Sequence, residues 1–111
     1  MTFAFDLDGT LNLWPALGVI MHELKNAGHK CIVLTAVPTG ETREHRVQML
    51  KDAGIMPGSY TDIVMSEDDG RSKAHYCHRN KVDVLVDDSL SNLDRTRSVS
   101  PNTCCLNVRP L

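Results

Sequence analysis

The sequence predicts an α/β domain: a five-stranded parallel sheet with helices on both faces. Short apolar segments of strand length alternate with longer amphipathic segments along the whole chain. The 111 residues are enough for one domain, so a single domain over residues 1–111 is expected. A hydrophobic content of 41% with 23% charged residues is ordinary for a globular fold, so a packed core is expected too.

The first strand and the first helix are predicted near the start of the chain. Residues 2–6 are apolar and aromatic, a composition that suits a short buried strand. Residues 15–27 are predicted as a helix, because proline suits a first helical turn and Gly28 can end the helix in a left-handed conformation. The apolar residues at helical spacing in this segment are Leu17, Ile20, Met21 and Leu24.

The later elements repeat this alternation. Strands are predicted at residues 31–35, 62–66, 82–87 and 103–108, and helices at 41–53, 72–80 and 89–98. Val47 and Leu50 share one face of the second helix, whereas the charged stretch 40–46 is expected to face solvent. Ser72 is predicted to cap the third helix.

In open parallel sheets, ligand sites lie beyond the carboxyl ends of the strands. The polar side chains at these predicted ends are those of Asp6, Thr35, Ser66, Asp87 and Asp88. We therefore expect a functional site at this edge of the sheet.

Two carboxylates directly follow the first strand, in the motif Asp6-Leu7-Asp8-Gly9-Thr10. Asp6 ends the strand and can point into a cleft, and Gly9 lets the loop turn sharply. One carboxylate can attack phosphorus and become an aspartyl-phosphate. The second can give a proton to the leaving oxygen and later take one from water. A plain acidic turn is the alternative interpretation.

Asp87 and Asp88 follow the fourth strand as an adjacent acidic pair. The two carboxylates repel each other, so they favour a bound cation. Hard oxygen ligands that face a phosphoryl group suit Mg²⁺, which would neutralise the carboxylates and the substrate oxygens together. The alternative is an acidic start to the following helix, which its dipole would favour.

Thr35 and Lys73 are candidates to bind the phosphoryl group. Thr35 ends the predicted second strand. Its hydroxyl can hold a phosphoryl oxygen together with nearby backbone N–H groups, including that of Ala36. Lys73 lies near the start of the third helix, where its ammonium can balance the acidic cluster. Lys81 is the rival lysine, but it directly precedes the fourth strand and so belongs at the opposite end of the sheet.

These four motifs, in this order, resemble those of phosphatases of the haloacid dehalogenase (HAD) superfamily. They read FAFDLDGTL, CIVLT, GRSK and VLVDDS, and the resemblance covers almost the whole chain. It implies a three-layer, Rossmann-like fold with the strand order 5-4-1-2-3. It also implies that Asp6 is the nucleophile, that Asp8 is the general acid/base, and that Thr35 and Lys73 bind the phosphoryl group.

The same resemblance implies a Mg²⁺ site. Asp6, the backbone carbonyl of Asp8, and Asp88 would hold the ion. Asp87 would act through a metal-bound water or by orienting Lys73.

Two features of the sequence bear on the substrate. Only residues 11–14 and 67–72 stand where larger HAD enzymes insert a cap domain, so we expect an open, capless site. Capless members act on large substrates or borrow a neighbouring subunit as a lid, so a homo-oligomer is one expectation. Within the open site, Trp14 can stack on a base or pack against the first helix, and Glu67, Asp68 and Asp69 are expected near the entrance.

Segments 37–46 and 81–93 resemble polynucleotide 3′-phosphatase domains, and the second also resembles 5′(3′)-deoxyribonucleotidases. This resemblance implies a nucleotide or a nucleic-acid end as the phosphorylated substrate. Polynucleotide phosphatases commonly carry Gly-Arg where this chain has Ala36 and Val37. Arg43 or Arg46 could supply the missing guanidinium, although a solvated helix face is the plainer interpretation of each.

Other functions stay open on the sequence alone. These are a phosphatase of a small sugar phosphate or a phosphoprotein, and a catalytically weak HAD-fold binding module. A two-component receiver does not fit, because its acidic pair follows the first strand. A zinc site at Cys77 with His75 and His78 lacks a second ligand pair.

The sequence also bears on the cellular location. The net charge of −2 gives no overall attraction to nucleic acid or to an anionic membrane. No signal-peptide pattern and no bilayer-length apolar run are present, so we expect a cytoplasmic protein with reduced cysteines and no membrane contact.

Overall fold

The computed structural model describes residues 1–67 and 70–109, and within these residues five strands form one parallel sheet. The strands are β1 (Thr2–Phe5), β2 (Lys30–Ala36), β3 (Asp62–Ser66), β4 (Val84–Asp87) and β5 (Cys104–Asn107). Their order is β3-β2-β1-β4-β5, and every neighbouring pair is parallel. This is the predicted order 5-4-1-2-3 counted from the other edge, so the predicted fold class is confirmed.

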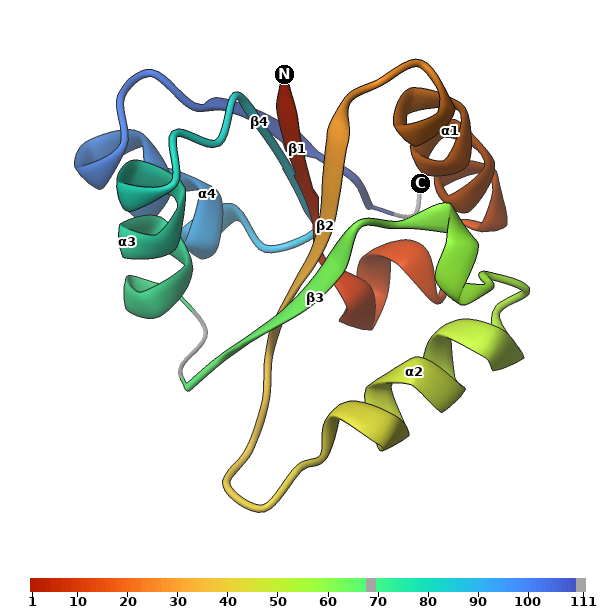
Figure 1. Ribbon diagram of the computed structural model, residues 1–111. Coiled ribbons are helices and arrows are strands. Elements are labelled where there is room, and N and C mark those ends of the chain that lie inside the picture. The colour runs from red at the N-terminus through yellow and green to blue at the C-terminus, as the bar shows by residue number, and fades with distance from the viewer. Residues whose placement is uncertain (68–69, 110–111) are drawn as a thin grey trace.

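Helices cover both faces of the sheet in the part of the chain that the structure describes. They are α1 (Pro15–Asn26), α2 (Arg43–Asp52), α3 (Arg71–Arg79) and α4 (Leu90–Val99), with the short turns η1 (Leu7–Leu11) and η2 (Pro57–Ser59). Figure 1 shows α1 and α2 on one side of the sheet and α3 and α4 on the other. Among the described residues, no helix is both long and apolar enough to cross a bilayer.

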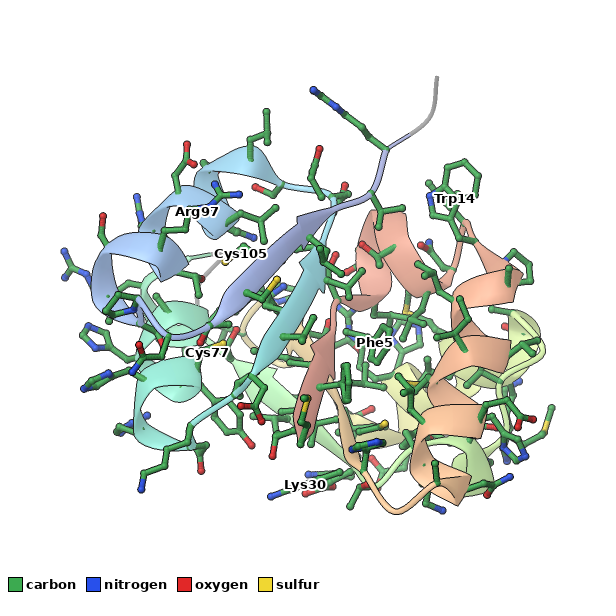
Figure 2. The ribbon with its side chains drawn as sticks, turned by 90° about the horizontal axis from the view of Figure 1, so that it is seen from above. Phe5, Trp14, Lys30, Cys77, Arg97 and Cys105 are labelled. Atoms are coloured by element: carbon green, nitrogen blue, oxygen red, sulfur yellow. The ribbon has the colours of Figure 1, made fainter. Side chains whose placement is uncertain are left out.

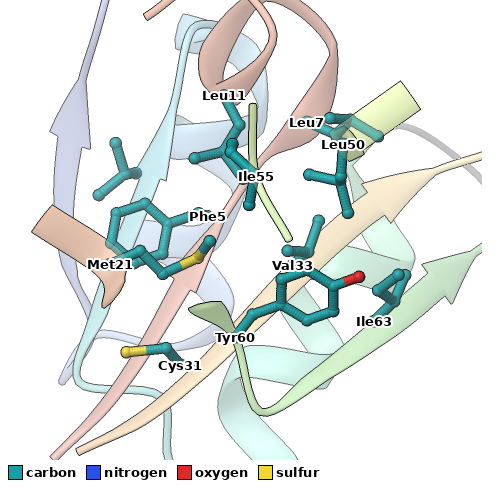
Figure 3. Packing of buried hydrophobic residues seen from close by; sticks show 11 residues of the cluster. Phe5, Leu7, Leu11, Met21, Cys31, Val33, Leu50, Ile55, Tyr60 and Ile63 are labelled. Carbon is teal, nitrogen blue, oxygen red and sulfur yellow. The ribbon is translucent and has the colours of Figure 1, made fainter. Parts of the chain in front are cut away.

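Alternating residues of the central strands supply two separate cores. Phe5 of β1 joins Met21 of α1 and Leu50 of α2 in one cluster, shown in Figure 3. Its neighbour Ala4 packs with Cys77 of α3 in the other cluster. Figure 2 shows Phe5 and Cys77 on opposite sides of the sheet. Side chains alternate along a strand, so β1 is packed against a core on each of its faces. This packing fixes the position of its carboxyl end.

The turn η1 connects β1 to α1 and carries the acidic motif. Leu7 and Leu11 are fully buried in the α1 side of the core, so they anchor both ends of the turn. Between them, Asp8 has an extended backbone and Gly9 a positive φ of +81°. The leucines therefore point inward while Asp8, between them, stays exposed.

Two local expectations were wrong. Gly70, not Ser72, precedes the first turn of α3, because the helix already begins at Arg71. Ile20 is 50% exposed, although its spacing suggested the buried face of α1. It precedes the buried Met21 by one position, which turns its side chain by about 100° around the helix.

The buried leucine in η1 gives a direct test of this anchoring. Leu11→Ala should lower the free energy of unfolding by about 2–5 kcal/mol, because it removes a fully buried side chain from under the loop. Leu13→Ala is the matched control, since Leu13 is 55% exposed and its loss should stay within about 0.5 kcal/mol. Urea unfolding measures both, and equal effects would contradict the anchoring role.

Candidate active site at the carboxyl ends of the strands

A buried lysine joins the ends of β1 and β4. Lys73 of α3 is 1% exposed, and its Nζ donates to Asp6 Oδ1 at 2.6 Å and to Asp87 Oδ2 at 3.2 Å. Asp6 and Asp87 are themselves 5% and 0% exposed. Buried charges are tolerated when they are paired, so these two ion pairs explain how three charged groups fit in the interior.

Burial and pairing act in opposite directions on the proton affinities of this cluster. Burial raises the pKa of Asp6 to about 7, although Lys73 beside it pulls the pKa down. Burial alone would lower the pKa of Lys73, but Asp6 and Asp87 outweigh it and raise that pKa. Lys73 is therefore an ammonium at neutral pH, and an additional cation beside Asp6 would favour its carboxylate form.

Three carboxylates converge next to this lysine. Asp6, Asp87 and Asp88 each offer an oxygen, and these atoms lie within 4.8 Å of one another. Among the described residues, this is the one group of three or more metal-ligating side chains so arranged. The cluster is tightly packed, because a Cβ added at Gly9 would lie 2.3 Å from Asp88 Oδ2.

Asp87 is held by several donors beyond Lys73. The backbone N–H of Ser89 donates to Asp87 Oδ1 at 2.9 Å, and Asn92 Nδ2 donates to Oδ2 at 3.5 Å. Asp88 belongs to the same acidic cluster but is only half-buried. Asp87 is therefore committed to protein contacts, whereas Asp88 keeps its carboxylate near the pocket.

Asp8 lies outside the carboxylate cluster and pairs with an arginine. Its carboxylate is 54% exposed and accepts a hydrogen bond of 2.7 Å from Arg46 NH1. Arg46 is 5% exposed, so the expectation that the charged start of α2 faces solvent is wrong at this residue. Arg43 does lie at the surface, where it pairs with Asp62 of β3.

These side chains surround a small cavity of about 240 Å³, to which Ala36 and Lys73 also contribute. Its lining residues are Asp6, Asp8, Ala36, Lys73, Asp87, Asp88, Ser89, Ser91 and Asn92. Thr35 lies next to Ala36, the last residue of β2, and its buried hydroxyl has no hydrogen-bond partner among the described residues. A buried, unpaired hydroxyl is costly, but Thr35 is not among the residues that line the cavity, so its part in binding a phosphoryl oxygen stays a prediction.

Other candidates lie elsewhere. Lys81 is exposed and lines a different cavity beside Asp83, ahead of β4. Trp14 is half-buried at the start of α1 (Figure 2) and does not line the site cavity. The suggested zinc ligands His75 and His78 are exposed, whereas Cys77 is buried. Of the acidic residues expected at the entrance, Asp68 and Asp69 lie outside the described residues.

Sequence reasoning missed three residues that contact the acidic groups. Thr10 Oγ1 donates to Asp6 Oδ2 at 3.1 Å, and its signal was the final position of the first motif. Asn92 stands five positions after Asp87, in the first turn of α4, where an amide can reach back to the carboxylate. Arg46 was named only as a substitute guanidinium, and nothing in the local pattern marked it as buried.

Comparisons with known proteins bear on the fold alone. No protein-family model and no curated protein sequence matches the chain. A universal stress protein in complex with cAMP has a TM-score of 0.63 at 18% identity, with 98% of this chain and 96% of the other covered. The core domain of a protein provisionally named a phosphoglycolate phosphatase, from Streptococcus pneumoniae TIGR4, has a TM-score of 0.60 at 16% identity, with 100% and 89% covered.

A third solved structure, a protein of the universal stress protein family from Burkholderia pseudomallei, has a TM-score of 0.53 at 13% identity, with 98% and 96% covered. At these identities the likeness establishes a shared α/β architecture. One neighbour carries a phosphatase name and two carry stress-protein names, so the chemistry has to be argued from the side chains of the site.

The close approach of Gly9 to Asp88 can be tested with a matched pair of glycines. Gly9→Ala and Gly40→Ala both place a side chain at a positive φ, +81° and +89°, and each should lose about 1–2 kcal/mol of unfolding free energy from this strain. Only the Cβ at position 9 meets a neighbour, Asp88, and the overpacking should cost about 1–3 kcal/mol more. Denaturant unfolding of the two variants compares them, and equal losses would contradict the packing of Gly9 on Asp88.

Proposed function

We propose that this protein is a Mg²⁺-dependent phosphomonoester hydrolase that works through an aspartyl-phosphate on Asp6. The observation that carries the proposal is the convergence of three carboxylates beside a buried ammonium at the carboxyl ends of β1 and β4. The motif order of the HAD phosphatases, which the sequence resembles, supports the same assignment.

The donor set fits a magnesium ion. Asp6 and Asp88 offer hard oxygen ligands, and the carbonyl oxygen of Asp8 is the expected third protein ligand. With Asp6, Asp87 and Asp88 ionised and Lys73 charged, three negative charges and one positive charge give the cluster a net charge of −2. When bound, a divalent cation would supply charge neutralisation for the carboxylates and the phosphoryl oxygens.

Each step of the proposed reaction is assigned to particular residues of this chain. An Asp6 oxygen attacks phosphorus while the bond from phosphorus to the leaving oxygen breaks, and Asp8 gives its proton to that oxygen. A water then attacks the aspartyl-phosphate, Asp8 takes a proton from it, and the bond from phosphorus to Asp6 breaks to release phosphate. Lys73 and the Thr35 hydroxyl bind the phosphoryl oxygens, and Asp87 keeps Lys73 in place.

The size of the cavity bears on the substrate. About 240 Å³ accommodates a phosphoryl group and the atoms next to it, whereas pockets that enclose a drug-sized ligand are about 300–1,000 Å³. The rest of a larger substrate would lie outside, as expected for a capless site. We therefore propose a nucleotide or a nucleic-acid end as the substrate class, in line with the resemblance to polynucleotide phosphatases and deoxyribonucleotidases.

A nucleotide-binding module without catalysis is the second candidate. The likeness to a universal stress protein in complex with cAMP favours it, because the two chains share one architecture. The acidic residues argue against it, since the four carboxylates around the cavity would repel a nucleotide phosphate unless a cation were bound.

The proposed function is tested by steady-state kinetics on a mononucleotide and on oligonucleotides phosphorylated at the 3′ or 5′ end. Wild-type protein should release phosphate with Mg²⁺ and lose this activity in EDTA while staying folded. Asp6→Asn should lower kcat at least about a thousandfold, because the amide is a poor nucleophile. Asp94→Asn is the matched control, since Asp94 is an exposed partner of Arg97 on α4.

Turnover by Asp6→Asn at the wild-type rate would exclude the covalent mechanism. Binding of the mononucleotide without any phosphate release would favour the binding module. Assays at low and high salt separate the substrates, because KM for a nucleic-acid end should rise steeply with salt and KM for a mononucleotide should not.

A further inference from the structure

Arg46 is an unusual residue for its place in the sequence. It lies in the first half of α2, where Arg43 and His45 are exposed. The Arg46 residue, by contrast, is only 5% exposed. A guanidinium is seldom buried unless it is paired, because it loses its hydration. Its burial therefore calls for a partner that the helix surface does not provide, and that partner is Asp8 of η1.

The contact with Asp8 bridges two elements that carry different parts of the site. Arg46 NH1 lies 2.7 Å from Asp8 Oδ2, across 38 positions of sequence. Within residues 1–67 and 70–109, Arg46 is the one side chain that donates a hydrogen bond to the Asp8 carboxylate. Without this contact, nothing among the described side chains would fix the direction of a carboxylate that is 54% exposed.

Arg46 is itself held from the other side. Its NH2 lies 3.8 Å from Glu41 Oε2, and the second oxygen of Glu41 pairs with His45 and accepts from the backbone N–H of Thr42. Thr42 also caps α2 by accepting a hydrogen bond from His45 N. Contacts with Glu41 on one side and Asp8 on the other thus orient the guanidinium of Arg46.

Arg46 does not reach the reacting groups directly. The residues that line the site cavity include Asp6, Asp8 and Lys73 but not Arg46. A role in binding the phosphoryl group therefore does not fit its place, whereas a role through Asp8 does. We propose, on the basis of the phosphatase function above, that Arg46 is a positioning residue that holds the general acid/base Asp8 toward the leaving-group oxygen.

This role predicts a dependence on the leaving group. Alkyl phosphates need a proton on the departing oxygen, whereas p-nitrophenyl phosphate leaves without one. Arg46→Met should lower kcat/KM for alkyl phosphates, a mononucleotide included, by about a hundredfold, and for p-nitrophenyl phosphate by less than about fivefold. Asp8→Asn should give the same pattern, and adding Arg46→Met to Asp8→Asn should change little.

Two further variants complete the experiment. Arg43→Met is the matched control, because Arg43 pairs with Asp62 at the surface of the same helix and should leave both substrates unaffected. Arg46→Lys keeps the charge but not the planar fork, so it should restore only part of the activity on alkyl phosphates. A retained kcat/KM for p-nitrophenyl phosphate, which reports the steps up to the aspartyl-phosphate and not its hydrolysis, shows in each variant that the fold and the nucleophile are intact.

Equal losses of kcat/KM on alkyl and aryl phosphates, or a rise in KM with kcat unchanged, would overturn the positioning role of Arg46. Either result would leave the phosphatase function in place. A further large loss when Arg46→Met is added to Asp8→Asn would overturn it as well. Wild-type protein that hydrolyses neither class of substrate would instead contradict the proposed function, and the inference about Arg46 with it.

Discussion

The pairing of Lys73 with two carboxylates is the interaction on which the site depends. Asp6 directly follows the central strand β1, and Asp87 ends its neighbour β4, so their carboxylates lie together at one edge of the sheet. Their oxygens lie within 4.8 Å of each other, and two buried negative charges so close would repel each other strongly in a medium of low polarity. The ammonium of Lys73 removes that repulsion, and α3 must pack against the sheet to deliver it.

The same balance of charge connects the fold to the chemistry. A carboxylate buried to 5% exposure, with its pKa raised to about 7, is less stable as an anion than one in water. As the proposed nucleophile, Asp6 would gain from a cation placed beside it. Leu7 and Leu11 are buried in the core and so anchor the loop that follows Asp6. The segment from Asp6 to Leu11 therefore contributes side chains both to the hydrophobic core and to the charged pocket.

Much of this arrangement could be predicted from the sequence, because its signals are local. Alternating strand and helix patterns predict the parallel sheet, and polar residues at strand ends predict that Asp6, Asp87 and Asp88 belong to one edge of it. Arg46 could not be predicted in the same way. Helical periodicity reports apolar faces, and a buried charge whose partner is 38 positions away leaves no trace in the local pattern.

The identity of the nucleophile is the central claim, and a phosphoryl analogue tests it directly. A crystal structure determined with Mg²⁺ and beryllium fluoride should show a trifluoroberyllate group bonded to a carboxylate oxygen of Asp6. Lys73 and the Thr35 hydroxyl should contact its fluorine atoms, and the metal should lie between Asp6 and Asp88. An adduct on Asp8 or Asp88, or a Mg²⁺-loaded site with Asp6 unmodified, would contradict the account.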